Sequence, residues 1–293
     1  MFKKILGLTL ISISLFAKID STKITEYKDG KFVIEKIKYL NFNNLDLSDK
    51  RKKDLNQFKL FFNDLKSPIF IANNIKEVNS LSIFNPPHTI IYSANNYKNR
   101  KIYSKNAIGI AYTSNEYFKV KRFTLEDEKN VFKNNNINGF VINDNVFILI
   151  NFSDKYYPKN PPKELIKKIK NLNFVVKKIR KELQKSKHNI IFIGKFGIPY
   201  NKLTNLVKGF KPIIKEGNEF ILQKSKRKHK IYKLANSENV LIFKENKDIF
   251  AKIDYNFMLK NYSGKNKTDK FIKKVSKYLP IDIYIKERIF KKW

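Results

Sequence analysis

The most constraining feature of this sequence is a strand that leads directly into a tight turn, at residues 189–199, which read NIIFIGKFGIP. Four consecutive apolar residues, 190–193, are typical of a strand that is buried on both faces. Gly194 and Gly197 then enclose Lys195 in the turn, where glycine supplies backbone conformations that other residues rarely adopt. The segment therefore predicts a buried strand that ends in a tight turn, with a lysine at the entrance of that turn.

The composition is compatible with one large domain. The chain has 293 residues, of which 42% are hydrophobic, enough for a substantial core. It contains no cysteine, which excludes disulfides and thiol chemistry. The sequence shows neither an internal repeat nor a Gly/Ser-rich linker, so we expect residues 18–293 to form a single domain. The oligomeric state stays open.

The N-terminus has the layout of a secretory signal. Lys3 and Lys4 precede an apolar stretch at residues 5–16, and Ala17 is a plausible residue before a cleavage site. We expect residues 1–17 to be a signal peptide, and the mature protein to be periplasmic or secreted. The alternative is an uncleaved anchor, although the stretch is shorter than the about 20 apolar residues of a membrane span. No later segment is apolar enough to cross a bilayer.

The net charge of +35 favours a polyanionic partner, either a nucleic acid or a membrane surface. The densest basic run is 224–230, KSKRKHK, for which a solvated hairpin or loop is the alternative. Lysine far outnumbers arginine, and asparagine, isoleucine, phenylalanine and tyrosine are abundant with it, as AT-rich codons produce without selection for binding. Both explanations of the charge remain open at this point.

Predicted strands and helices alternate along the chain. Strands are expected at residues 32–40, 69–72, 89–93, 107–113, 119–123, 139–141, 146–152, 190–193, 219–223, 230–234, 240–243 and 281–285, with a hairpin turn at 143–145. Apolar residues spaced three and four apart predict one helix over 55–65 and a longer one over 165–183, with Pro162 in its first turn. This order predicts an α+β fold of two packed mixed β-sheets flanked by helices.

Six segments, taken in order, resemble the motifs of the DNase-I-like endonuclease/exonuclease/phosphatase superfamily. Residues 36–42 resemble its strand "IxTWNV" and 68–76 its "DIIxLQEV"; 147–153 resemble "FxxxNxHL" and 194–197 "GDFN"; 237–240 resemble "YDxI" loosely, and 276–281 resemble "SDHxPV". The resemblance covers almost the whole mature chain and implies the DNase-I-like four-layer sandwich. It also implies that these strand ends meet at one end of the sandwich.

The same resemblance implies which residues of this chain stand at the family's metal-binding and catalytic positions. Asn41 keeps the family's asparagine, whereas Asn74 stands where a glutamate binds a divalent metal. Ser153 replaces a catalytic histidine, and Lys195 replaces the aspartate of GDFN. In the last motif Lys277 replaces the aspartate, and Tyr278 replaces the histidine base. We therefore expect no bound metal. Mg²⁺ is expected only under the alternative hypothesis, in which the protein is an enzyme.

Three hypotheses follow from this pattern. The first is a binding protein without catalysis, in which Asn41, Asn74, Ser153, Lys195, Lys277 and Tyr278 form a site for a nucleic acid or another phosphate-bearing ligand. The second is a divergent metal-dependent phosphodiesterase whose catalytic groups come from Glu77, Asp144, Asp154 or Glu238. The third is an envelope protein that retains only the fold. The three histidines lie far apart without metal-ligand spacing, and no catalytic residue is assigned.

Overall fold

The computed structural model describes residues 25–27, 30–45, 67, 69–75, 88–93, 97–98, 101–102, 107–113, 120–129, 131–132, 136–183, 189–223, 230–243, 249–255 and 267–289. Several sequence expectations lie outside these residues: the signal peptide 1–17, the helix at 55–65, Glu77, and residues 224–229 of the basic run. None of the helices within the described ranges has the length and apolar character of a membrane span.

One sheet is built around a long strand near the N-terminus. Its order is β16 (Ile249–Ile253), β17 (Ile281–Ile289), β2 (Gly30–Leu45), β3 (Ile69–Ile75), β7 (Ala107–Thr113) and β4 (His88–Ser93), and β1 (Thr25–Tyr27) also pairs with β2. The pair β2–β3 is parallel and the other pairs are antiparallel. We call this the first sheet.

The second sheet contains the predicted strand at 190–193. Its order is β12 (Phe210–Pro212), β15 (Glu238–Phe243), β11 (Asn189–Lys195), β10 (Asn145–Asn151), β9 (Asn136–Ile142) and β8 (Val120–Glu126). Only β10 and β11 run parallel, and α3 (Lys163–Lys170) and α4 (Leu172–Leu183) connect them. The remaining elements are α5 (Tyr200–Leu206), α7 (Lys267–Lys274), the hairpin β13 (Glu219–Gln223)–β14 (Ile231–Ala235), and the short pair β5 (Tyr97–Lys98)–β6 (Lys101–Ile102).

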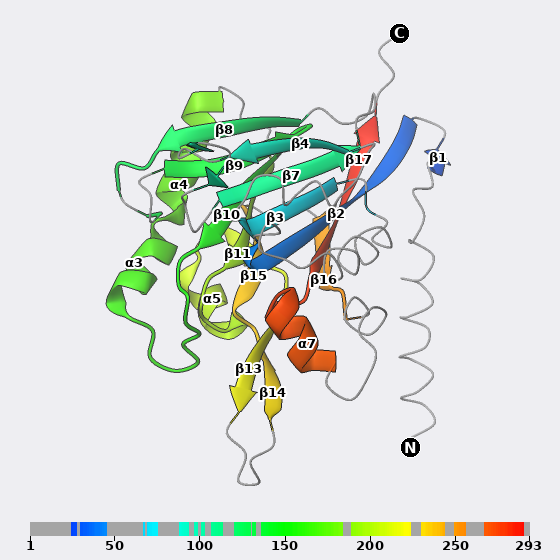
Figure 1. Cartoon of the computed structure of the whole chain (residues 1–293). Helices are drawn as coiled ribbons and strands as arrows, with labels where there is room; N and C mark the ends of the chain where they lie inside the picture. Colours follow the sequence, from blue (N-terminus) through cyan, green and yellow to red (C-terminus); the bar gives the residue numbers. More distant parts are fainter. Residues whose placement is uncertain are drawn as a thin grey trace, which may run out of the picture.

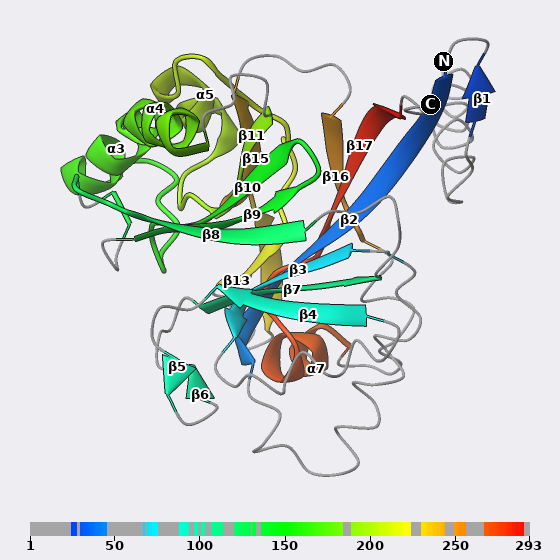
Figure 2. The ribbon, with the colours of Figure 1, turned by 90° about the horizontal axis from the view of Figure 1, so that it is seen from above.

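The two sheets pack face to face, and α3, α4 and α5 cover the outer side of the second sheet (Figures 1 and 2). Strand β11 shows how the sequence produces these layers. Ile191 and Ile193 point into the core between the sheets, whereas Ile190 and Phe192 point into the core beneath the helices. Because successive side chains of a strand alternate between faces, a strand between two cores must be apolar at every position.

The α+β class with two packed mixed sheets is confirmed, and so are most of the predicted strands. The hairpin at 143–145 is confirmed too: Asn143 has φ 52°, a conformation that asparagine tolerates. The single helix expected over 165–183 is wrong in detail, because it is interrupted at Asn171, which separates α3 from α4. Strands β12 and β16 and helices α5 and α7 were not expected, since each is eight residues long or shorter.

The parallel pairs decide where polar side chains gather. Both β2–β3 and β10–β11 bring two strand ends to the same edge, and β15 begins beside the end of β11, with Glu238 opposite Lys195. Strand β17 begins beside the same stretch of β2, with Ile281 opposite Tyr39. The starts of β15 and β17 and the ends of β3, β10 and β11 therefore meet at one end of the sandwich.

Candidate functional site

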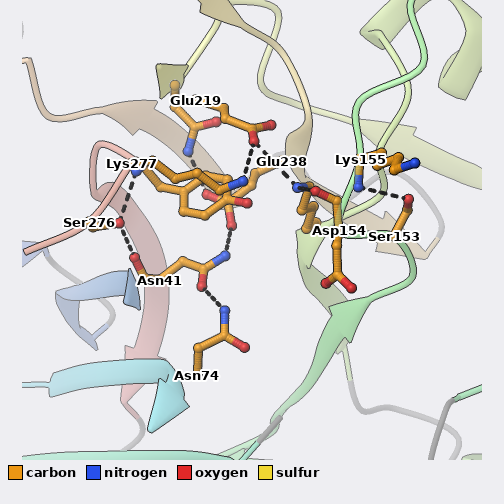
Figure 3. Close-up of polar contacts among 12 residues, drawn as sticks. Asn41, Asn74, Ser153, Asp154, Lys155, Glu219, Glu238, Ser276 and Lys277 are labelled. Carbon is orange, nitrogen blue, oxygen red and sulfur yellow. Dashed lines mark hydrogen bonds and ion pairs between the residues drawn. The ribbon is translucent and has the colours of Figure 1, made fainter. Parts of the chain in front are cut away.

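Four amide and carboxylate side chains form a hydrogen-bonded chain across the two sheets, and Figure 3 shows three of them, Asn74, Asn41 and Glu238. Asn151 at the end of β10 donates to Oδ1 of Asn74 at 3.3 Å, and Asn74 donates to Oδ1 of Asn41 at 2.5 Å. Asn41 in turn donates to Oε1 of Glu238 at 2.5 Å. Asn74 has φ 57°, and asparagine is among the few residues that adopt this left-handed conformation readily. The chain ties the ends of β2, β3, β10 and β15 together.

Glu238 is fully buried at the inner end of this chain. Its Oε1 also accepts from the hydroxyl of Tyr39 at 3.2 Å, and its Oε2 accepts from Nδ2 of Asn218 at 2.6 Å. Burial raises the pKa of Glu238 to about 7, because the ionised form loses its hydration, although the amide donors from Asn41 and Asn218 favour it. Glu238 therefore changes charge near neutral pH inside the protein.

A second cluster places one carboxylate between two lysines. Oε1 of Glu219, at the start of β13, lies 3.3 Å from Nζ of Lys195 and 2.9 Å from Nζ of Lys277. Burial would raise the pKa of Glu219, but Lys195, a hydrogen bond from Ser237 and Lys277 together outweigh it, so the pKa is lowered overall. Both ammonium groups also lie over the ring of Tyr278, at 5.4 and 5.1 Å from its centroid. The cluster is thus a buried lysine–glutamate–lysine arrangement beside an aromatic ring.

Lys195 lies beneath the loop that follows β10. Its ammonium donates to the carbonyl of Asp154 at 2.6 Å, and only 2% of the residue is exposed. Burial lowers the pKa of Lys195, and Glu219 partly offsets this effect. The backbone holds the same loop, since the N–H of Tyr157 donates to the carbonyl of Gly197 at 2.7 Å. Lys195 therefore lies beneath the site, and its hydrogen bond to Asp154 holds the loop after β10 in place.

The two glycines of the turn are required by the close approach of this loop. Gly194 has φ 132°, and a Cβ there would lie 2.2 Å from the carbonyl oxygen of Ile150. Gly197 has φ 76°, and its Cβ would lie 2.9 Å from Cβ of Ser153. Side chains cannot occupy these positions without moving the backbone. The turn expected at 194–197 begins later, because β11 continues through Gly194 and Lys195 before the chain bends at Gly197. The close approach holds Lys195 directly against the loop after β10.

The structure brings together the residues expected at the site. Asn41 contacts Asn74, and Lys195, Lys277 and Tyr278 contact one another through Glu219 and the aromatic ring. Ser153 lies in the same loop as Asp154, but its hydroxyl accepts from the backbone N–H of Lys155 at 3.1 Å instead of joining either cluster. The side chain of Lys277 is 35% exposed, so it is the cation of the cluster that a ligand can reach.

Sequence reasoning missed several residues that hold the site. Glu219 and Asn218 lie in none of the six motifs, and Tyr39 reads as an ordinary strand residue. Ser276 was matched as the serine of the last motif but was assigned no role. Its hydroxyl donates to the carbonyl of Asn41 and accepts from the N–H of Tyr278 at 2.9 Å. The sequence offered one signal for Glu219, an acidic residue at the start of a predicted strand. This signal does not identify the lysines with which Glu219 pairs.

The acidic residues of the enzyme hypothesis are dispersed. Asp144 lies in the β9–β10 turn, at the opposite end of β10 from Asn151. Asp154 is exposed and meets Lys195 through its backbone carbonyl. Glu238 is inside the network described above and has no exposed surface. Glu77 lies outside the described residues.

No protein-family model matches the sequence, and no curated protein matches it either. Solved structures do match. An endonuclease/exonuclease/phosphatase family protein from Bacteroides thetaiotaomicron has a TM-score of 0.51 and 11% identity, covering 87% of this chain and 98% of its own. The endonuclease/exonuclease/phosphatase from Bacteroides vulgatus has a TM-score of 0.52 and 9% identity, covering 87% and 99%.

A third similar structure is TDP2 from D. rerio, solved in complex with a single strand DNA product. It has a TM-score of 0.51 and 9% identity, and the match covers 86% of this chain and 98% of that one. At such identities the likeness concerns the fold. The order of the six motifs, the two packed mixed sheets and these matches agree, and the chain has the DNase-I-like fold of the endonuclease/exonuclease/phosphatase superfamily.

Proposed function

We propose that this chain is a catalytically inactive protein of the DNase-I-like fold that binds a nucleic acid or another phosphate-bearing ligand without cleaving it. The observation that carries the proposal is the lysine–glutamate–lysine cluster of Lys195, Glu219 and Lys277. Two of its members occupy positions where the superfamily's motifs have aspartates. The charge at this end of the sandwich is therefore reversed relative to those motifs.

The residues at this site do not fit a divalent metal ion. Mg²⁺ and Ca²⁺ bind accessible carboxylate and carbonyl oxygens. Here the Asn74 amide oxygen already accepts from Asn151, and Oε1 of Glu219 contacts two ammonium groups. The carboxylate of Glu238 is buried and bonded on both oxygens. Within the described residues, no three His, Asp or Glu side chains form a group that could hold a metal. We propose no metal-dependent step.

The groups that would move protons in hydrolysis are also unsuitable. Tyr278 stands where the superfamily has a histidine base, and burial raises its pKa far above the usual range for tyrosine. A group that stays protonated at neutral pH cannot act as a general base there. Ser153 stands at the other histidine position, and a hydroxyl without an adjacent base is a weak nucleophile. These substitutions support binding without cleavage.

Phosphate binding is supported by the half-exposed ammonium of Lys277. A phosphate oxygen that approaches it competes with one carboxylate oxygen of Glu219, so binding needs only a change of partner for this lysine. Asn74 and Ser153 are partly exposed on the same end and can donate or accept hydrogen bonds. The net charge of +35 and the DNA complex of the similar protein TDP2 agree with a polyanionic ligand.

We further propose that the protein is exported, since Lys3, Lys4 and the apolar residues 5–16 have the layout of a signal peptide. Mass spectrometry of the protein isolated from the cell envelope or medium tests this point. A mature N-terminus near Lys18 agrees with cleavage, whereas an intact Met1 in a membrane pellet indicates the anchor.

The proposed function is tested by combining a cleavage assay with a binding assay. Purified protein is incubated with DNA, RNA and a generic phosphodiester in the presence of Mg²⁺ or Mn²⁺, and binding of the same nucleic acids is measured in EDTA. We expect binding without cleavage. Metal-dependent turnover that Glu238→Gln or Asp154→Asn abolishes would establish the divergent phosphodiesterase instead. Absence of both activities would leave a protein that retains only the fold.

A further inference from the structure

A row of lysines runs along the outer face of α3 and α4, away from the site described above. The row consists of five exposed side chains, Lys163, Lys167, Lys170, Lys177 and Lys181. With about 3.6 residues per helical turn, all five fall within about 40° of a single line. Leu165, Ile169 and Val176 occupy the opposite face and pack on the second sheet. We call these five residues the lysine row.

The interruption at Asn171 does not break the row. Asn171 has φ −77° and ψ −2°, close to helical values, and its N–H donates to the carbonyl of Lys167. The row spans 18 residues, which corresponds to about 27 Å at 1.5 Å per residue. Figures 1 and 2 both place α3 and α4 on the outside of the molecule.

Two acidic residues near the row form ion pairs with lysines outside it. Glu164 contacts Lys168 at 3.0 Å, and Glu128 contacts Lys178 at 2.6 Å. Among the residues that the structure describes, no member of the lysine row takes part in an ion pair. Like charges three and four residues apart on a helix destabilise it. A surface that carries this cost along two successive helices has a charge pattern suited to a polyanion.

Two further exposed lysines lie in the chain segment that connects the candidate site to α3. Lys155 and Lys159 are both exposed and lie in the segment between β10 and α3. The backbone N–H of Lys155 donates to Ser153, within the loop that Lys195 fastens (Figure 3). The chain segment between the loop at the site and the outer helices therefore also carries exposed lysines.

We propose that the lysine row binds the sugar–phosphate backbone of a nucleic acid without reading its sequence. Its length of about 27 Å requires an extended ligand instead of a small phosphate compound. Lysines act as point charges on phosphates, and contacts of this kind position a nucleic acid without specifying its bases. The proposal does not depend on Lys277, because the row is a separate surface.

A membrane surface fits the row less well. Helices that lie on a bilayer insert apolar side chains beside their basic residues. The exposed large hydrophobic side chains of the described residues are Leu222, Ile231 and Tyr255, and none of them belongs to α3 or α4. The apolar side of these two helices is instead used against the second sheet.

The test replaces all five lysines of the row with glutamine and measures binding of a labelled 20-base-pair duplex by fluorescence anisotropy at several salt concentrations. A matched control replaces five other exposed lysines, at positions 121, 215, 233, 252 and 270. We expect the row variant to lower the slope of log affinity against log salt by about four to five, because five phosphate contacts are lost. The control should change that slope by much less.

Two outcomes would overturn the inference. Equal slopes for the row variant and the control would show that the row acts only through total charge. Unchanged duplex binding together with lost binding to anionic lipid vesicles would assign the row to membranes. Inorganic pyrophosphate serves as a probe of the Lys277 site alone, and its affinity should be the same in the row variant and the wild type. Failure of pyrophosphate to bind the wild type would therefore count against the proposed function and not against the row.

Discussion

At the scale of single residues, the chain keeps the DNase-I-like fold although basic residues stand where the superfamily's motifs have acidic ones. Lys195 and Lys277 stand at acidic positions of the superfamily's motifs, and Glu219 supplies the missing negative charge from a different element. An isolated buried ammonium group would be strongly unfavourable, so the carboxylate on β13 is the physical condition for Lys195. Glu219 is therefore the residue that makes the substitutions at 195 and 277 compatible with folding.

Replacing Lys195 by methionine tests this condition. The variant leaves Glu219 buried with the partly exposed Lys277 as its remaining ammonium partner, and breaking a buried ion pair in this way costs about 3 to 5 kcal/mol. Urea unfolding should show that loss. Lys277→Met is the matched control and should cost about 1 kcal/mol or less, because its ammonium is partly solvated. Equal losses in the two variants would contradict the role assigned to Lys195.

Glu238 predicts a distinctive dependence of stability on pH. Its pKa of about 7 in the folded protein lies above that of an unfolded glutamate, about 4.3, so the folded state binds the proton more tightly. The contribution of Glu238 to the free energy of unfolding is full below the unfolded pKa and decreases as the pH rises towards 7. The loss amounts to about 4 kcal/mol, at about 1.4 kcal/mol for each pKa unit.

Urea unfolding of the wild type and of Glu238→Gln at pH 5 and pH 8 measures this effect. The free energy of unfolding of the wild type should fall relative to that of the variant between the two pH values. Other titrating groups are common to both proteins and cancel in the comparison. Parallel pH profiles would show that the carboxyl of Glu238 keeps an ordinary pKa.

At the scale of elements, the site depends on the turn after β11 and on the loop after β10. Gly194 sets the distance between them, because a Cβ there would meet the carbonyl oxygen of Ile150 at 2.2 Å. A methyl group cannot push aside a backbone carbonyl that lies within the β10–β11 pair without shifting that pair. The turn residues are thus as important for the site as the polar side chains.

Gly194→Ala should consequently be among the most destabilising single changes in the second sheet, by more than about 3 kcal/mol. Gly209→Ala is the control, since Gly209 also has positive φ, at 79°, but its nearest neighbour would be 3.6 Å away. That variant should lose only about 1 kcal/mol, the cost of the backbone conformation. Thermal or urea unfolding compares the two, and a smaller loss at Gly194 would contradict the close approach.

The elements also show what a sequence can reveal. Strands such as β7, which matches the expected 107–113, are readable because a buried strand is a run of apolar residues between turn signals. The interruption at Asn171 is not readable, because the apolar spacing continues through it. The positions of Asn41, Asn74, Lys195 and Lys277 followed from the motif order, whereas Glu219 comes from a hairpin whose contact with Lys277 exists only in three dimensions.

At the scale of the whole molecule, the two parallel strand pairs bring the site together, and the outer helices carry the lysine row. The order of the motifs predicted that these strand ends meet at one end of the sandwich, and they do so in the structure. The net charge of +35 could not distinguish codon usage from binding. The arrangement of charges does make a distinction, since acids pair with Lys168 and Lys178 and leave the outward lysines of the same helices without ion pairs among the described residues.

The central claim is that this end of the fold holds phosphate with a lysine where the superfamily's motifs provide metal chemistry. The most direct test is the affinity of the wild type and of Lys277→Ala for a short phosphorylated oligonucleotide, measured by calorimetry in EDTA and again with Mg²⁺. We predict that the wild type binds equally well in both buffers, and that Lys277→Ala binds about tenfold more weakly, the loss of about 1.4 kcal/mol expected for a charge-assisted contact. Binding that requires Mg²⁺ and is unaffected by Lys277→Ala would contradict the account.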